Sequence, residues 1–303
     1  MITKRLLFTS SRQSFLRSID VNVTSVGIAK KAILMAQKLG QKWALEELET
    51  VVFNMVYFFA KEHRSAAKKK LKTGATVPEE LRDVPIMLFH LLRGPCLGPI
   101  LQHDDDIRCV QNVLLNSSLE VCLRIIQPQL YCLRQEDILK TRHLISGHTP
   151  SKNGEDNISH ILAQEITSKD YMRNIPIVSL ALQSNVMLIL DHHTDIFVWS
   201  GHSVRGSEYD KIRSALVKIL SPRVQHRYPH PNIMLFNEND SMARWFEARL
   251  IPAHKDNEFL QMQDCQSLLG DLSHEQRKQL NKKLLWTDDR SFHEWLGHVI
   301  CGK

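Results

Sequence analysis

One segment of the sequence carries an arginine that could act on a phosphate group. Arg244 follows Asp240 and Ser241 at the expected start of a helix that ends near Leu250. A guanidinium group is permanently charged and can meet two phosphate oxygens at once, so this residue type suits a phosphate ligand. Near the start of a helix its charge opposes the helix dipole, and function is one reason to accept that mild cost. By residue pattern alone, a solvated surface arginine is the simpler interpretation.

The same segment predicts how Arg244 is oriented. Apolar residues recur at helical spacing and should form a buried stripe: Met242, Trp245, Phe246 and Leu250. Arg244 lies two residues from Met242, about 200° around a helix, and should therefore project from the opposite face. The neighbouring Arg249 falls on or near the apolar stripe and is the local competitor for any role of an exposed arginine.

A second segment, Asp191-His192-His193-Thr194-Asp195, contains residue types that bind metals. Successive side chains on an extended chain point to opposite faces, so adjacent histidines cannot easily share one ion. A polar turn is therefore the favoured interpretation, with a metal site as the alternative. The acidic run His103–Asp106 lacks the alternating acids and closing glutamate of an EF-hand loop, so calcium is not expected. Without a glycine-rich phosphate loop or a nucleophile elbow, the chain is not expected to be a nucleotide-binding enzyme.

The composition is that of a globular protein with room for two modest domains. Among 303 residues, 43% are hydrophobic and 24% are charged, and the six cysteines form no Cys-x-x-Cys pair. This cysteine usage argues against a zinc knuckle and for a reducing, cytosolic compartment. The formal charge of +6 suggests acidic partners such as an anionic membrane surface or nucleotide phosphates. Nothing beyond this bulk charge supports nucleic-acid binding, and no run reaches the roughly 18 apolar residues of a membrane span.

The amino-terminal half has a helical pattern. Ser25 can cap a helix that Gly40 ends, and apolar residues at steps of three and four predict a second, central helix with Leu48 and Val52 on its buried face. The basic segment 66–78 is expected to be solvated surface, with contact to acidic lipid as the alternative. Residues 149–157 are rich in Pro, Ser, Asn, Gly and charged residues, which indicates a linker between domains.

After this linker the pattern changes to strands that alternate with helices. Val186–Leu190 and Asp195–Trp199 predict a hairpin, and Ser207 is expected to cap a helix. A strand at Ile233–Phe236, a helix at 240–250, a polar excursion from Ala253 to Lys283, a short strand at Leu284–Trp286 and a final helix at Asp289–Val299 should follow. The predicted fold class is α+β, an all-α helical domain followed by a mixed sheet packed by helices.

Several motifs resemble the carboxy-terminal part of the GTPase-activating subunit of the COPII inner coat. They are Phe89–Arg93, Leu115-Asn116 with Ile126–Leu130, Leu188–Asp191 running on to Gly201, Arg227–Pro231, and Thr287–Phe292 ending at His298. The resemblance implies a remnant strand of an upstream β-sandwich at residues 1–20, a helical domain at 21–148, a linker at 149–175 and a gelsolin-like domain at 176–303. At the amino terminus, Ile2–Thr9 is expected to be that strand, and a transit peptide is the alternative suggested by composition.

The resemblance also implies a function. The family's Ser-x-Ala-Arg-Phe-Leu element contains an arginine that is inserted into the small GTPase of the coat, and Ser241–Phe246 matches it. Arg244 would then be an arginine finger supplied in trans, and the chain a GTPase activator rather than an enzyme. The expected partner is this small GTPase, joined by the cargo-binding coat subunit if the upstream trunk domain is supplied. An acidic membrane surface is a further candidate, and the expected location is the cytoplasmic side of the endoplasmic reticulum and COPII vesicles. No cofactor is expected here, because the family's zinc ribbon lies in its amino-terminal region.

Three alternatives remain open at this point. The chain could be a catalytically silent coat or adaptor fragment, the paralogous cargo-binding subunit, or an actin-binding gelsolin module. The retained arginine in the Ser-x-Ala-Arg frame argues against the cargo-binding paralogue. Fold analogy by itself does not establish actin binding.

Overall fold

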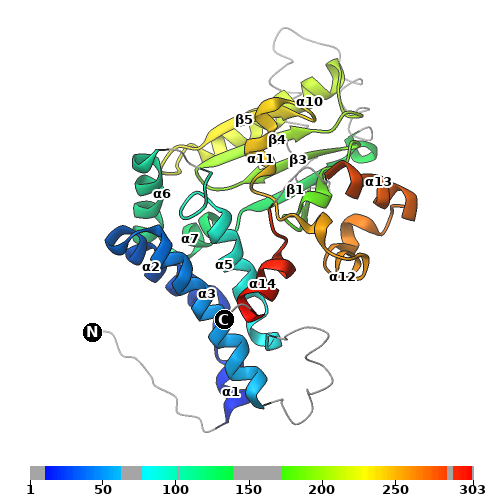
Figure 1. Ribbon diagram of the computed structural model, residues 1–303. Helices are drawn as coiled ribbons and strands as arrows, with labels where there is room; N and C mark the ends of the chain where they lie inside the picture. Colours follow the sequence, from blue (N-terminus) through cyan, green and yellow to red (C-terminus); the bar gives the residue numbers. More distant parts are fainter. Residues whose placement is uncertain (1–10, 63–76, 101–102, 139–171, 285–288, 302–303) are drawn as a thin grey trace.

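The computed structural model describes residues 11–62, 77–100, 103–138, 172–284 and 289–301 (Figure 1). Three expectations lie outside these residues: the strand at Ile2–Thr9, most of the basic segment 66–78, and the linker at 149–157. Among the described residues, no helix is long and apolar enough to cross a membrane.

The first described region is helical. It contains α1 (Arg12–Arg17), α2 (Val21–Leu39), α3 (Gln41–Glu62), α5 (Asp83–Arg93), α6 (Asp104–Asn116) and α7 (Leu119–Ile126). The carboxylate of Asp20 accepts hydrogen bonds from the amides of Asn22 and Val23, so α2 starts earlier than predicted. Ser25 is buried inside this helix instead of capping it. Gly40 ends α2 as predicted, with a φ of 103° that glycine adopts readily.

In the part of the chain that the structure describes, the helical region passes directly into a mixed sheet of five strands. Helix α7 ends at Ile126, and because Pro128 cannot donate the next helical hydrogen bond, the chain becomes extended. The strands are β1 (Gln129–Arg134), β2 (Arg173–Ile175), β3 (Val186–Asp191), β4 (Asp195–Ser200) and β5 (Asn232–Asn237), in the order β2-β1-β3-β4-β5. Among the described strands, only β4 and β5 pair in parallel, and β3 and β4 form the predicted hairpin. The α+β class and the mixed sheet are therefore confirmed.

Alternate residues of the central strands face two different cores, as the period of two in a strand requires. Met187 and Ile189 pack with Ile212 and Leu216 of α10 (Ser207–Val224), which covers one face of the sheet. Leu188, Leu190, Phe197 and Trp199 face the other side and join the core of the helical region. Figure 1 shows α10 and the helical region on opposite sides of the sheet.

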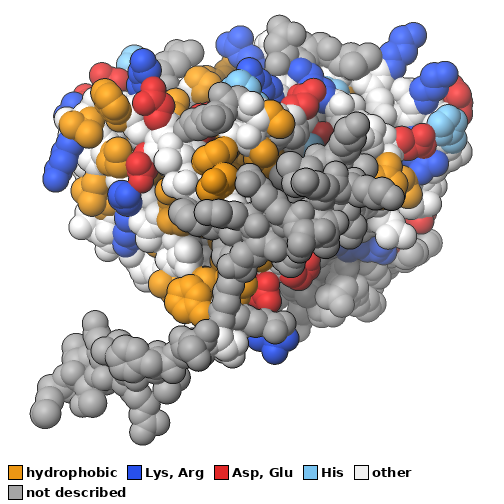
Figure 2. All heavy atoms as spheres, turned by 60° about the horizontal axis from the view of Figure 1, so that its bottom comes forward, with side chains coloured by type: hydrophobic (Ala, Val, Ile, Leu, Met, Phe, Trp, Pro, Cys, Tyr) orange, Lys and Arg blue, Asp and Glu red, His pale blue; other side chains and the backbone are white. Residues whose placement is uncertain are grey.

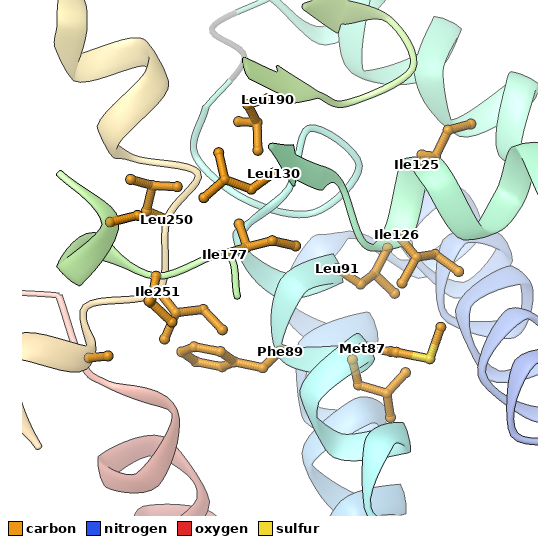
Figure 3. Packing of buried hydrophobic residues seen from close by; sticks show 14 of the residues in the cluster. Met87, Phe89, Leu91, Ile125, Ile126, Leu130, Ile177, Leu190, Leu250 and Ile251 are labelled. Atoms are coloured by element: carbon orange, nitrogen blue, oxygen red, sulfur yellow. The ribbon is translucent and has the colours of Figure 1, made fainter. Parts of the chain in front are cut away.

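The helices and the sheet share this second core. In Figure 3, Phe89 and Leu91 of α5 lie close to Leu130 of β1 and to Ile177 and Ile251. The last helix, α14 (Phe292–Cys301), returns from the sheet to the helical region, where the Phe89 ring lies 5.0 Å from that of Trp295. Strand β1 falls within the range 21–148 and β2 within 149–175, so the sheet begins earlier in the chain than the predicted gelsolin-like domain.

Two local predictions in the second half need correction, and the structure defines the polar excursion more closely. Ser207 is the first residue of α10 and makes no capping bond, because Gly206 with a φ of 111° precedes the helix. Leu284 is the last residue of α13 (His274–Leu284) and not the start of a strand, while residues 285 and 286 are outside the described set. The polar excursion from Ala253 contains α13 and α12 (Glu258–Leu269), whose apolar positions reach the core.

Among the described residues, the surface of the helical end carries small groups of apolar side chains. Seen from this end, hydrophobic side chains lie in small groups among charged ones (Figure 2). The exposed hydrophobic residues of α2 and α3 include Leu39, Trp43 and Tyr57. Scattered apolar side chains of this kind are ordinary on a protein surface.

Candidate functional site

The segment that carries Arg244 starts at the edge of the sheet. Strand β5 ends at Asn237, and the carboxylate of Asp240 accepts a hydrogen bond from the Asn237 amide at 2.6 Å. Asn239 adopts a φ of 71° within this tight turn, a conformation that asparagine tolerates better than most residues. A single 3-10 turn (Ser241–Ala243) follows, and then the short helix α11 (Arg244–Glu247). Arg244 therefore sits at the junction of two helical turns, seven residues after Asn237, the last residue of β5.

The predicted long helix at 240–250 and its buried stripe are partly wrong. Met242 is 50% exposed, whereas Ala243, Phe246 and Leu250 are buried. A 3-10 turn has about three residues per turn, so Ala243 and Phe246 share a face and Met242 is rotated outward. Arg244 is exposed as predicted, although Met242 does not lie buried opposite it.

Aromatic stacking fixes the position of α11. The ring of Phe246 lies 6.2 Å from that of Trp199 with an interplanar angle of 11°, and 6.3 Å from that of Phe197. Both partners belong to β4, the strand next to β5 in the sheet. Pairs of this kind add roughly 0.5–1.5 kcal/mol beyond burial. The backbone that carries Arg244 is thereby held on the sheet, while its guanidinium pairs with no residue in the described part of the chain.

Arg249 has a different environment, although it lies only five residues away. Its side chain is 2% exposed, 3.2 Å from Asp195 and 4.3 Å from the centre of the Phe197 ring. It also donates to the carbonyl of Trp245. Burial lowers the pKa of the Arg249 guanidinium, and the carboxylate of Asp195 acts in the opposite direction. Arg249 thus holds α11 against β4 and is not available to a partner.

Arg93, at the end of α5, ties the Arg244 segment to the helical region. Its guanidinium donates to the carbonyls of Ala248 and Leu250 at 3.1 and 3.2 Å, and to Asp289 at 3.0 Å. The two carbonyls belong to the turn that follows α11. The sequence placed Arg93 in a family motif but indicated nothing of this contact, because 155 residues separate it from Ala248.

A small pocket of about 130 Å³ opens beside these groups. It is lined by Arg93, Arg244, Glu247, Leu250, His254 and Asp289, among others. His254 is 4% exposed, and its Nδ1 lies 2.9 Å from the hydroxyl of Ser179. Burial lowers the pKa of His254 to about 4, so this histidine is neutral near pH 7. Arg244 is therefore the group at this rim that can offer an unpaired positive charge to an anionic oxygen of a partner.

Glu238 is a further residue whose role the sequence did not indicate. Its buried carboxylate accepts hydrogen bonds from the ammonium group of Lys283, from the hydroxyl of Ser184 at 3.3 Å and from the amide of His202 at 2.6 Å. Burial acts to raise the pKa of Glu238, but the hydrogen bonds from Lys283 and His202 lower it on balance. Glu238 directly follows β5, so this network holds the start of the turn that leads to Arg244.

The segment Asp191–Asp195 forms the β3–β4 turn, as favoured from the sequence. Asp191 accepts two hydrogen bonds from Arg227, at 2.6 and 2.7 Å. Nε2 of His192 is 3.0 Å from the Ile125 carbonyl, and Nε2 of His193 is 3.3 Å from the Tyr228 carbonyl. Burial lowers the pKa of His192 to about 3. Across the described ranges, no group of three His, Cys, Asp or Glu side chains is arranged to hold a metal ion.

Comparison with known proteins places this geometry in a family. No protein-family model matches the chain. Over 301 residues it is 31% identical to protein transport protein SEC23 A of Arabidopsis thaliana, a match that covers 98% of this chain and 29% of that protein. The chain is a homologue of the carboxy-terminal region of the Sec23/Sec24 coat proteins. The resemblance predicted from the motifs is thereby confirmed.

Solved structures show the same fold. The crystal structure of the human COPII-coat protein Sec24c superposes with a TM-score of 0.53 over 89% of this chain and 32% of the chain in that structure, at 12% identity. At this identity the likeness concerns the fold, a helical region followed by a mixed sheet with helices. The chain spans less than a third of the length of the relatives it matches.

In this Sec23/Sec24 homologue, family motifs that are distant in sequence meet in space. Arg93 binds Asp289, which joins the Phe89–Arg93 motif to the Thr287–His298 motif. The Asp191–Arg227 pair joins the hairpin motif to Arg227–Pro231 in the same way. Ser291 donates to Asp256 and caps α14 together with Glu294. The residues of these motifs therefore hold distant backbone segments together.

Replacing Arg93 should separate the Arg244 segment from α5. We expect Arg93→Met to lower the free energy of unfolding by about 2–3 kcal/mol, because two carbonyls and a carboxylate lose a charged donor. Arg124→Met is the matched control, since Arg124 makes an exposed i,i+4 pair with Glu120 at 2.8 Å. That pair should contribute no more than about 0.5 kcal/mol. Urea unfolding followed by circular dichroism measures both variants, and equal losses would show that the Arg93 contacts do not stabilise the fold.

Proposed function

We propose that this chain acts in the COPII coat during transport from the endoplasmic reticulum to the Golgi, where it stimulates GTP hydrolysis by the coat's small GTPase. Arg244 is the arginine finger in this proposal. The partners are that GTPase and the cargo-binding coat subunit, at the cytoplasmic surface of the endoplasmic reticulum and on coated vesicles. The homologue SEC23 A is named as a protein transport protein, and this supports a role of the chain in protein transport.

One observation carries the assignment of the finger. Arg244 is exposed and pairs with no described residue, on a segment held by Phe246 stacking and by the Arg93 hydrogen bonds. In phosphoryl transfer, catalysis depends on positioning and on stabilising charge that develops on the phosphate oxygens. A charged group that is already in place costs no rearrangement at the moment of reaction. The competitor Arg249 is buried and paired, which leaves Arg244 as the arginine of this segment that a partner can reach.

The small size of the pocket beside Arg244 supports activation in trans. The pocket beside it measures about 130 Å³, which is well below the roughly 300–1,000 Å³ of typical ligand sites. A nucleotide would therefore have to come bound to its own protein. Arg244 stands on the rim, where its side chain can extend into a neighbouring active site.

Single-turnover hydrolysis tests the function. The GTP-loaded coat GTPase is mixed with the full 303-residue chain, and phosphate release is followed with time. We expect clear stimulation at high concentrations of the chain and weaker binding than for a full-length coat subunit. Stable interfaces usually bury about 1,200–2,000 Å², and the family's interface extends onto the trunk domain. Binding without any stimulation would favour a silent adaptor, and affinity equal to that of the full-length subunit would contradict the expected contribution of the trunk.

A further inference from the structure

A second and larger cavity lies at the junction of the helical region and the sheet. Its volume is about 390 Å³, within the range of ligand sites, and it shares no lining residue with the Arg244 pocket. Helix α5 forms one side, and α12 and the start of α14 form the other. Ile86, Ile177, Leu260 and Phe292 give it apolar walls.

The charged groups around this cavity are mostly acidic. Glu79, Asp83, Asp256 and Asp264 all line it. The basic groups that face it are Arg82 and His293, and both pair with Asp264, at 3.6 and 2.7 Å. The cavity lining therefore carries four carboxylates and only two basic groups that pair with them, Arg82 and His293. The chain as a whole has a formal net charge of +6. The cavity is a local acidic site on a basic protein, which favours a cationic ligand.

A buried histidine adds an independent sign of a ligand. His90 of α5 is only 4% exposed and lines the cavity, and no described residue makes a hydrogen bond with its ring nitrogens. Its ring nitrogens are not among the fully buried polar atoms that lack a partner, so a ligand in the cavity can reach them. Burial lowers the pKa of His90 to about 3, so the ring is neutral near pH 7 and one ring nitrogen is free to accept a hydrogen bond.

We propose that this cavity binds a lysine or arginine side chain of a partner protein, together with a neighbouring apolar residue. The carboxylates attract the cationic group, and His90 offers an acceptor to one of its N–H donors. The apolar walls suit the aliphatic stem of the basic side chain and the residue beside it, since long basic side chains bury their stems against apolar surface. The site is thus a recognition pocket for basic–apolar peptide segments, separate from the GTPase-activating surface.

Peptide titration of the full chain tests this site. The probes are four blocked pentapeptides with leucine on both sides of a central arginine, lysine, glutamine or glutamate. Binding is followed by NMR of the chain with labelled histidines, because His90 and His293 report directly from the cavity wall. We expect the arginine and lysine peptides to shift the His90 signals and the glutamate peptide to leave them in place. Equal binding of the arginine and glutamate peptides, or no binding at about 10 mM, would overturn the proposal.

Reversing the charge of two exposed acidic residues that line the cavity tests whether the peptide binds there. Glu79 and Asp83 are exposed, so the double variant Glu79→Lys/Asp83→Lys should fold normally and bind the arginine peptide about tenfold more weakly. The matched control is Asp104→Lys/Asp105→Lys, two exposed acids in the first turn of α6 that do not line the cavity. The control should keep the affinity of the unmodified chain. Unchanged affinity in the Glu79→Lys/Asp83→Lys variant would place the peptide elsewhere and exclude this site, whatever the outcome of the GTPase assay.

Discussion

Arg244→Ala should remove the stimulation of GTP hydrolysis while leaving binding of the GTP-loaded partner nearly unchanged. An arginine finger supplied in trans contributes roughly 10³–10⁵ in rate, because it stabilises charge that develops only in the transition state. The folded structure should tolerate the change, since Arg244 is exposed and pairs with no described residue. The expected loss of unfolding free energy is therefore below about 0.5 kcal/mol.

A lysine at this position should not restore the activity. Arg244→Lys keeps the charge but offers a compact ammonium in place of the planar fork that meets two phosphate oxygens. Single-turnover hydrolysis with both variants, and with Arg108→Ala as an exposed control on α6, measures these effects. If Arg244→Ala stimulates as strongly as the unmodified chain, the finger is not Arg244 and the assignment fails.

Arg249→Ala should lower the stability of the fold strongly, whereas Arg244→Ala should lower only the GTPase stimulation. We expect the free energy of unfolding to fall by about 3–5 kcal/mol, because the partly buried carboxylate of Asp195, 15% exposed, would lose its charged partner and the buried space of Arg249 would be left unfilled. The contact of the guanidinium with the Phe197 ring, 4.3 Å from its centre, would be lost as well. Residual effects on GTP hydrolysis should then follow the amount of folded protein.

A second variant separates the ion pair from general packing. Arg249→Met combined with Asp195→Val removes both charges and keeps apolar volume, so most of the lost stability should return. Urea unfolding at neutral pH measures the single and double variants, with Arg244→Met as the matched control a few residues away. A loss below about 1 kcal/mol for Arg249→Ala would mean that the pair does not hold α11 against β4.

Features that depend on local pattern were predictable from the sequence. The β3–β4 hairpin follows from two apolar runs around a polar turn, and Gly40 ends α2 because glycine tolerates a positive φ. The motif Ser241–Phe246 indicated Arg244, and the structure shows it exposed. In each case the residues that decide the conformation are neighbours in the chain, so their spacing carries the information.

Features that depend on distant partners were decided by the tertiary structure. Met242 fits a helical stripe, yet Phe246 stacks on Trp199 and the chain takes a 3-10 turn that leaves Met242 exposed. Strand β1, which lies before the predicted linker, was not predicted as part of the sheet. Its partner β3 is more than fifty residues away in the chain, so no local pattern indicates the pairing. The fold also decides that Arg93 supports the Arg244 segment. It decides that Arg249 is buried while Arg244 is exposed, because the groups involved come together only in the folded core. Charge and residue type are local properties, but burial and pairing are properties of the assembled fold.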